Sequence, residues 1–187
     1  MVISAEKGFT LLEVLIAVAM MSILLAIASF YLGGRGEKSQ LKSAAADLAG
    51  TMNLARASAI RDARPWAVQF DPGGNRYVVY SNAGEAYAPE DPADPIDWTD
   101  GDETTFRSGS LPQGVSFGSN QGELNAVAIG DGVTYVNDRI VFFPNGICSG
   151  SGTLYLTVVS GSTFAVTTLS ATGQVKIWSN YGAGWSN

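Results

Sequence analysis

Residues 9–32 read FTLLEVLIAVAMMSILLAIASFYL, and this stretch decides the architecture of the chain. It carries one carboxylate, Glu13, and no Lys or Arg. A helix rises about 1.5 Å per residue, so a helix over this stretch is long enough to cross a hydrocarbon core about 30 Å thick. A cleavable secretory signal has an apolar run of only about 7–15 residues, followed by a small-residue cleavage site. The length therefore favours a transmembrane helix over residues 9–32.

Glu13 is the one charged residue of this run. A lone carboxylate in hydrocarbon costs roughly 2.5–3.5 kcal/mol on insertion scales, and such residues usually have a partner. The run itself offers no cation. A partner charge therefore comes from another molecule or from a chain end, or else Glu13 is protonated near the membrane edge or reaches water by snorkelling.

Composition excludes several kinds of function. The 187 residues include no histidine, so catalysis and metal binding through His are ruled out. The single cysteine, Cys148, can form neither an intramolecular disulfide nor a Cys-based zinc site. No Lys or Arg lies beside it in sequence, so we predict a structural thiol. No nucleophile sits in a recognisable catalytic motif, and we expect no enzyme, although a carboxylate site in an acidic loop stays open.

The charge is unevenly distributed along the chain. Residues 1–64 have a net charge of +2 and residues 65–187 one of −8, which together give −6. Phosphate recognition needs Lys or Arg, yet the last 48 residues carry only Lys176. A nucleic-acid partner is therefore not expected.

The residues after the apolar run predict a second helical stretch over 33–64. It opens with GGRG, and Gly33, Gly34 and Gly36 each cost a helix about 0.5–1 kcal/mol, so we predict a hinge there. We favour a continuous or hinged helix over a two-helix hairpin. Beyond the glycines, apolar residues recur at spacings of three and four until Pro65 stops the helix near Ala63. This stripe consists of Leu41, Ala44, Leu48, Met52, Ala55 and Ala59.

From Trp66 onward the apolar pattern has a period of two. The turn at 71–75 separates two such runs and predicts a hairpin. Further strands are predicted over 124–129, 133–136, 139–143, 153–159, 163–169 and 175–178. Short connections favour antiparallel pairing. The predicted class is α+β, with a long N-terminal helix packed on a C-terminal antiparallel β-sandwich or sheet domain over residues 65–187. An aromatic tail, Trp178, Tyr181 and Trp185, is expected to form a buried edge or a subunit contact.

An acidic insertion interrupts this domain at residues 85–103. It holds eight Asp or Glu residues and three prolines but no Lys or Arg, which is typical of a solvated segment. The alternative is a calcium site, because calcium takes about six to eight oxygen ligands. Its candidate ligands are Asp97, Asp100, Asp102 and Glu103, whose spacing does not match an EF-hand loop. No other cofactor is expected.

The segment Lys7-Gly8-Phe9-Thr10-Leu11-Leu12-Glu13 resembles the processing motif of type IV prepilins and of the pseudopilins of type II secretion. The resemblance implies that residues 1–8 are a leader peptide and that a prepilin peptidase cuts between Gly8 and Phe9. The peptidase then methylates the new amino terminus at Phe9, and Glu13 becomes the fifth residue of the mature chain. The new α-amino group can supply the missing positive partner for Glu13 of a neighbour.

Three further stretches are similar to the GspH/FimT subclass of this family: 54–60 running into the hairpin, 140–146 with the strand at 154–159, and 169–177. The resemblance implies a minor pseudopilin, a structural subunit of a type II secretion pseudopilus. The alternative is a minor pilin of a type IV pilus, with a role in DNA uptake. The implied partners are other pilin or pseudopilin subunits, the peptidase and lipid of the inner membrane.

The implied localisation is the inner membrane, with a single pass and the C-terminal domain in the periplasm, before entry into a pilus or pseudopilus. Charge alone favours the opposite orientation, because Lys7 stands against Arg35, Lys38 and Lys42 on the far side of the apolar run. The peptidase of this family acts on the cytoplasmic side, and the processing motif therefore places the amino terminus there.

Overall fold

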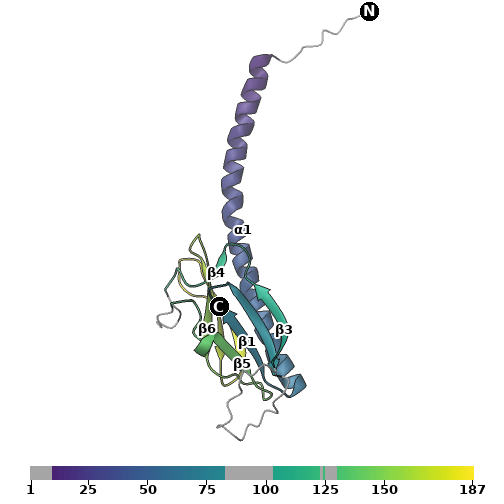
Figure 1. Cartoon of the computed structure of the whole chain (residues 1–187). Helices are drawn as coiled ribbons and strands as arrows, with labels where there is room; N and C mark the ends of the chain where they lie inside the picture. Colours follow the sequence, from purple (N-terminus) through teal and green to yellow (C-terminus); the bar gives the residue numbers. More distant parts are fainter. Residues whose placement is uncertain (1–9, 83–102, 123, 125–129) are drawn as a thin grey trace, which may run out of the picture. The chain divides into compact units, whose positions relative to one another are not determined.

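The computed structural model describes residues 10–82, 103–122, 124 and 130–187. The chain divides into two compact units, Met1–Gly36 and Glu37–Asn187. One helix, α1 (Leu11–Asp62), contributes to both (Figure 1). Its backbone stays helical through Gly33, Gly34 and Gly36, so the glycines do not form the turn of a two-helix hairpin. Their role as a hinge remains a prediction.

The part of α1 in the second unit packs through the predicted stripe. All six residues of the stripe are buried, and Ala45, Ala49, Thr51 and Ser58 widen the buried face. One hydrophobic core joins these residues to side chains of both sheets. Small side chains suit this position because they let the helix approach the strands closely at native packing density.

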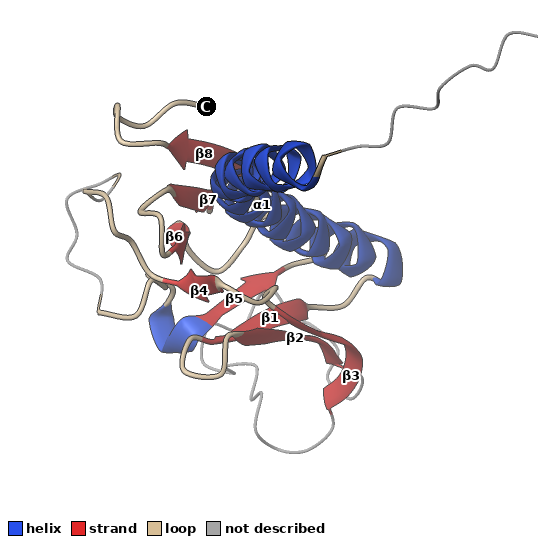
Figure 2. Ribbon diagram, turned by 90° about the horizontal axis from the view of Figure 1, so that it is seen from above, coloured by secondary structure: helices blue, strands red, loops and turns tan. Residues whose placement is uncertain are grey.

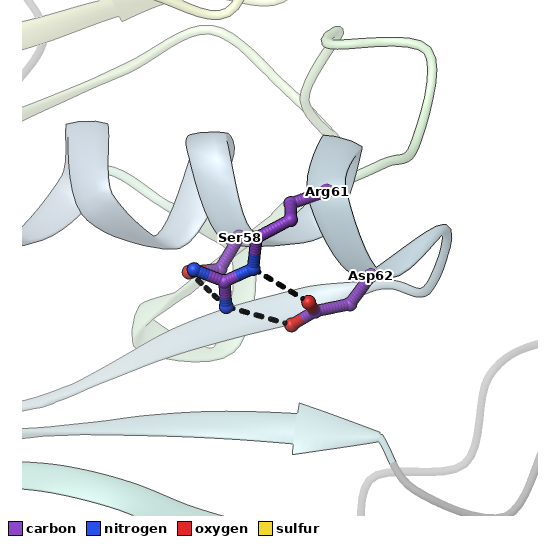
Figure 3. A network of polar contacts seen from close by, with 3 residues as sticks. All are labelled: Ser58, Arg61 and Asp62. Carbon is purple, nitrogen blue, oxygen red and sulfur yellow. Dashed lines mark hydrogen bonds and ion pairs between the residues drawn. The ribbon is translucent and has the colours of Figure 1, made fainter.

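The C-terminal end of α1 follows from its sequence. Ala63 has a φ of 51°, and the N–H of Arg64 donates to the carbonyl oxygen of Ala59 at 3.3 Å, which is a Schellman-type end. Pro65 then prevents continuation. In the last turn, Arg61 Nε donates to Asp62 Oδ1 at 2.8 Å and Arg61 Nη2 lies 3.4 Å from Ser58 Oγ (Figure 3). The neighbouring guanidinium lowers the pKa of Asp62.

Two four-stranded antiparallel sheets make up the rest of the second unit, and Figure 2 shows them as separate groups of strands. The first has the order β3-β2-β1-β5 and the second the order β4-β6-β7-β8. The first contains β1 (Trp66–Asp71), β2 (Arg76–Asn82), β3 (Glu103–Ser110) and β5 (Arg139–Phe142). The second contains β4 (Val115–Phe117), β6 (Gly152–Val158), β7 (Thr163–Leu169) and β8 (Gln174–Asn180). The α+β class is confirmed.

The strand predicted over 133–136 is wrong. Val133 makes a single bridge to Leu154, and a short 3-10 helix, η1 (Val136–Asp138), follows. The two residues after the predicted strand, Asn137 and Asp138, have φ values of 55° and 54°, so the backbone turns into the left-handed region directly after Val136. The strand predicted over 124–129 falls outside the described residues except for Leu124.

A polar contact fixes α1 to the first sheet. The Tyr77 hydroxyl donates to Asp47 Oδ2 at 2.6 Å, and Arg107 Nη2 lies 3.2 Å from Asp47 Oδ1. Gly109 makes room for the Tyr77 ring, because a Cβ there would lie 2.4 Å from Tyr77 Cζ. The carboxylate of Asp47 on α1 therefore contacts both β2, through Tyr77, and β3, through Arg107.

Replacing Tyr77 with Phe should destabilise the second unit by about 1–2 kcal/mol, because the bond to a charged but half-exposed acceptor is lost. Arg107→Gln is the matched comparison and should cost less than about 1 kcal/mol, since it removes only an exposed ion pair. Urea unfolding of the parent and the two variants measures both losses of stability. Equal losses would contradict the view that the Tyr77 hydroxyl makes the stronger contact with Asp47.

The stability of this unit should fall as the pH rises above about 10, the ordinary pKa of tyrosine. Burial raises the pKa values of Tyr77 and Tyr135 in the folded chain. The unfolded chain therefore loses these protons at a lower pH than the folded chain, and unfolding becomes progressively more favourable above the unfolded pKa. Unfolding curves of the parent and of Tyr135→Phe, recorded from neutral to alkaline pH, should show a shallower decline for the variant.

Candidate functional site

The start of α1 is capped by Thr10. The carbonyl oxygen of Thr10 accepts the N–H groups of Glu13 and Val14 at 3.1 and 3.2 Å, and Thr10 Oγ1 accepts the Glu13 N–H at 3.2 Å. This places Thr10 at the N-cap and Glu13 at the third helical position, the T-x-x-E spacing of a capping box. A carboxylate in the first turn is also favoured by the helix dipole. This role of Thr10 was not predicted, although its spacing to Glu13 signals it.

The helix surface that follows is apolar on all sides. Every residue from 11 to 27 is exposed, and the large apolar side chains among them have exposed fractions between 50% and 83%. They are Leu11, Leu12, Val14, Leu15, Ile16, Val18, Met20, Met21, Ile23, Leu24, Leu25 and Ile27. A helix that is apolar all round is stable only when lipid or protein covers it.

Across the described part of the chain, no helix combines the length and hydropathy of a membrane span.

The predicted span at 9–32 is only partly described, since Phe9 and the side chains of residues 28–32 are outside the described set. It therefore remains a prediction.

The carboxylate of Glu13 is exposed within this apolar surface. The ion pairs among the described residues join Arg61 to Asp62, Arg76 to Asp71 and Arg107 to Asp47, and none of them includes Glu13. Gly8 and Phe9, the predicted processing residues, lie outside the described residues. Glu13 therefore presents an exposed carboxyl group within an otherwise apolar helix surface.

The calcium prediction concerns a different part of the chain. Asp97, Asp100 and Asp102 lie outside the described residues, while Glu103 begins β3 and pairs with Asn82 of β2. Among the residues with described positions, no cluster of acidic, His or Cys side chains could hold a metal ion. Because three of the four candidate ligands lie outside the described residues, the calcium site remains a prediction.

Cys148 and the two tryptophans of the aromatic tail make contacts within the second unit. Cys148 is buried, its Sγ lies 3.3 Å from the carbonyl oxygen of Gly150, and burial raises its pKa, which makes it an unreactive thiol. Trp178 Nε1 donates to Thr167 Oγ1 at 3.0 Å, and Trp185 Nε1 donates to the carbonyl oxygen of Gly122 at 2.8 Å. The burial of Cys148 agrees with a structural thiol, whereas a subunit contact through the aromatic tail remains a prediction.

The three stretches that resemble the GspH/FimT subclass meet at Arg56 of α1. Arg56 Nε donates to the carbonyl oxygen of Gly146 at 2.9 Å. Gly173, in the turn between β7 and β8, lies against the same group, because a Cβ on it would be 2.3 Å from the Gly146 oxygen. Gly146 and Gly173 have φ values of 83° and 59°, which favour glycine. Arg56 therefore fixes the helix to turns from both sheets.

Comparison with protein families gives two matches. The model described as "Type II transport protein GspH" matches residues 44–176, and the model described as "Prokaryotic N-terminal methylation motif" matches residues 3–29. The second match includes Gly8, Phe9 and Glu13. The comparison with curated proteins found no relative.

Solved structures with a similar arrangement include two minor subunits. The minor pseudopilin EpsH of the type 2 secretion system of Vibrio cholerae is 14% identical, with a TM-score of 0.48, over 75% of this chain and 97% of that one. The type IV minor pilin FimU of Pseudomonas aeruginosa is 16% identical, with a TM-score of 0.47, over 80% of this chain and 95% of that one.

Proposed function

This chain belongs to the family of the type II transport protein GspH, and from that premise we propose that it is a minor pseudopilin or minor pilin, a structural subunit of a helical fibre. The finer proposal is a minor pseudopilin of a type II secretion pseudopilus. The observation that carries it is the start of α1: a helix surface that is apolar on every side and holds one exposed carboxylate. Such a surface needs a cover of lipid or protein, and in the fibre a neighbouring helix that brings a cation would pair with the carboxylate.

The cover changes during the life of the subunit. Before assembly, lipid surrounds residues 9–32 and the second unit lies in the periplasm. Removal of residues 1–8 between Gly8 and Phe9 then creates an amino group at the start of the helix. During assembly the helices of neighbouring subunits replace lipid, and the amine of one subunit meets Glu13 of the next. Pairing offsets the cost of each buried charge, roughly 2.5–3.5 kcal/mol for a lone carboxylate on insertion scales.

The second unit supplies the outer surface of the fibre. It is stabilised independently of Glu13, through the core and the contacts of Asp47 and Arg56. Several of its arginines have partners within the unit: Arg61, Arg76 and Arg107 are in ion pairs, Arg56 donates to a backbone carbonyl, and Arg139 donates to Gln69. These contacts, with the net charge of −6, disfavour a role in binding DNA.

Mass spectrometry of the protein isolated from its native membrane tests the processing step. We expect a mature chain that begins with N-methylated Phe9. Gly8→Leu, which alters the residue before the cut, should leave the chain at full length, whereas Ser4→Ala in the leader should be processed normally. An intact amino terminus on fibre-incorporated protein would contradict the proposal.

A further inference from the structure

One end of the second unit carries an exposed group of residues that the proposed fibre contact does not use. Lys38 and Lys42 are exposed on α1, four residues apart and therefore on the same helix face. Lys38 Nζ lies 5.5 Å from the ring centroid of Tyr181, which follows β8. Thr163 at the start of β7 pairs with Asn180, so the turn before β7 and Tyr181 lie at the same end of the second sheet. That turn begins with Val159.

These four residues, Lys38, Lys42, Val159 and Tyr181, form what we call the end surface. Val159 has an exposed fraction of 90% and Tyr181 one of 52%. Tyr181 is held in place by an edge-to-face contact with Phe164, whose ring centroid is 5.6 Å away. The end surface thus combines two cations, an aromatic ring with a polar tip and an apolar side chain at the tip of a turn.

Lys38 of the end surface follows the predicted span closely in sequence. Lys38 follows Leu32 by six residues, about 9 Å of helix, which is within the reach of a lysine in the headgroup layer. The opposite end of the unit is marked by Gly173 beside Arg56, eighteen residues further along α1. Lysine stems with charged heads and tyrosine rings are the side chains that occupy the boundary between lipid and water.

We propose that, in the unassembled subunit, the end surface lies against the membrane and binds the phosphate-bearing headgroups of anionic phospholipids. The inference rests on the proposed membrane span. The contact gives Lys38 and Lys42 a physical role. Without it, their position after the apolar run disagrees with the positive-inside rule for membrane orientation. It holds the subunit at the bilayer until neighbouring helices replace the lipid.

The test uses the full chain, reconstituted at a low ratio of protein to lipid so that copies do not meet. A fluorophore whose emission rises and shifts to the blue in lipid is attached to Val159→Cys. Thr172→Cys, in the exposed turn at the opposite end, is the matched control, and the parent protein measures labelling of the buried Cys148. Vesicles contain phosphatidylcholine alone or about one third phosphatidylglycerol, and flotation reports whether the chain is anchored.

We expect a blue shift at position 159 but not at position 172, and a larger shift in the vesicles with phosphatidylglycerol. Lys38→Gln and Lys42→Gln should each lower the ratio of docked to undocked chains about fivefold in those vesicles. The end-surface proposal alone would be overturned if the chain floats but the blue shifts at 159 and 172 are equal. It would also be overturned if neither lysine substitution changes the ratio of docked to undocked chains. A chain that does not float would overturn the membrane span, and this inference with it.

Discussion

Glu13→Gln should reduce incorporation of this subunit into fibres by on the order of a hundredfold while leaving membrane insertion intact. The substitution keeps the size of the side chain but removes the charge that the amine of a neighbour requires. That amine would then be surrounded by apolar helices without a counter-charge. Insertion should be unchanged or improved, since a neutral side chain enters hydrocarbon at lower cost. Quantification of the subunit in isolated fibres measures incorporation. Carbonate extraction of membranes measures insertion.

Two variants control this experiment. Glu37→Gln removes a carboxylate from the same helix outside the apolar run and should assemble as the parent does. Glu13→Asp keeps the charge on a shorter side chain and should retain part of the assembly. Normal incorporation of Glu13→Gln, or an equal defect in Glu37→Gln, would contradict the assigned role of Glu13.

Gly173→Ala should have the largest effect on the stability of the second unit, with a loss of about 2–5 kcal/mol. A non-glycine residue in the left-handed region costs roughly 1–2 kcal/mol, and forcing a methyl group into a packed site costs about 1–3 kcal/mol more. Here the methyl group would lie 2.3 Å from the carbonyl oxygen of Gly146, which is backbone and also accepts the bond from Arg56. Urea unfolding of the full chain in detergent, followed by tryptophan fluorescence, measures the loss.

Gly114→Ala is the matched control for this substitution. Gly114 has a φ of 86°, but a Cβ there would meet nothing within 4 Å. The control therefore isolates the cost of placing alanine at a positive φ. The φ of Gly114 is less favourable for alanine than the φ of Gly173. If Gly173→Ala destabilised the unit no more than Gly114→Ala, the contact between Gly173 and Gly146 would not hold the sheets to α1 as described.

Local patterns were sufficient to predict much of the fold. The small apolar stripe of α1 repeats at helical spacing, and all of its residues are buried. The strand predicted over 163–169 has the same bounds as β7, because its alternation is bounded by glycine and serine. The Schellman-type end at Ala63 follows from Pro65 two residues later.

Other parts depend on contacts that no local pattern reveals. The β3 sequence, ETTFRSGS, has no apolar alternation and forms an edge strand through its pairing with β2. The η1 turn depends on Gln69 of β1, whose Nε2 donates to the carbonyl oxygens of Asn137 and Asp138 at 2.9 and 3.1 Å. At the candidate site, the position of Glu13 near the start of an apolar helix was predictable, and so was the capping spacing to Thr10. The convergence of Arg56, Gly146 and Gly173 required the three-dimensional structure.

The measurement that tests the central claim most directly is the proximity of Glu13 to a neighbour's amino terminus inside an assembled fibre. Fibres would combine this chain, labelled with ¹³C at its glutamate carboxyl carbons, with neighbouring subunits labelled with ¹⁵N at phenylalanine. We predict a solid-state NMR dipolar contact between the Glu13 carboxyl carbon and the N-terminal nitrogen of a neighbour, within about 4 Å, and its loss in Glu13→Gln. Intact fibres that contain this chain but show no such contact would contradict the account.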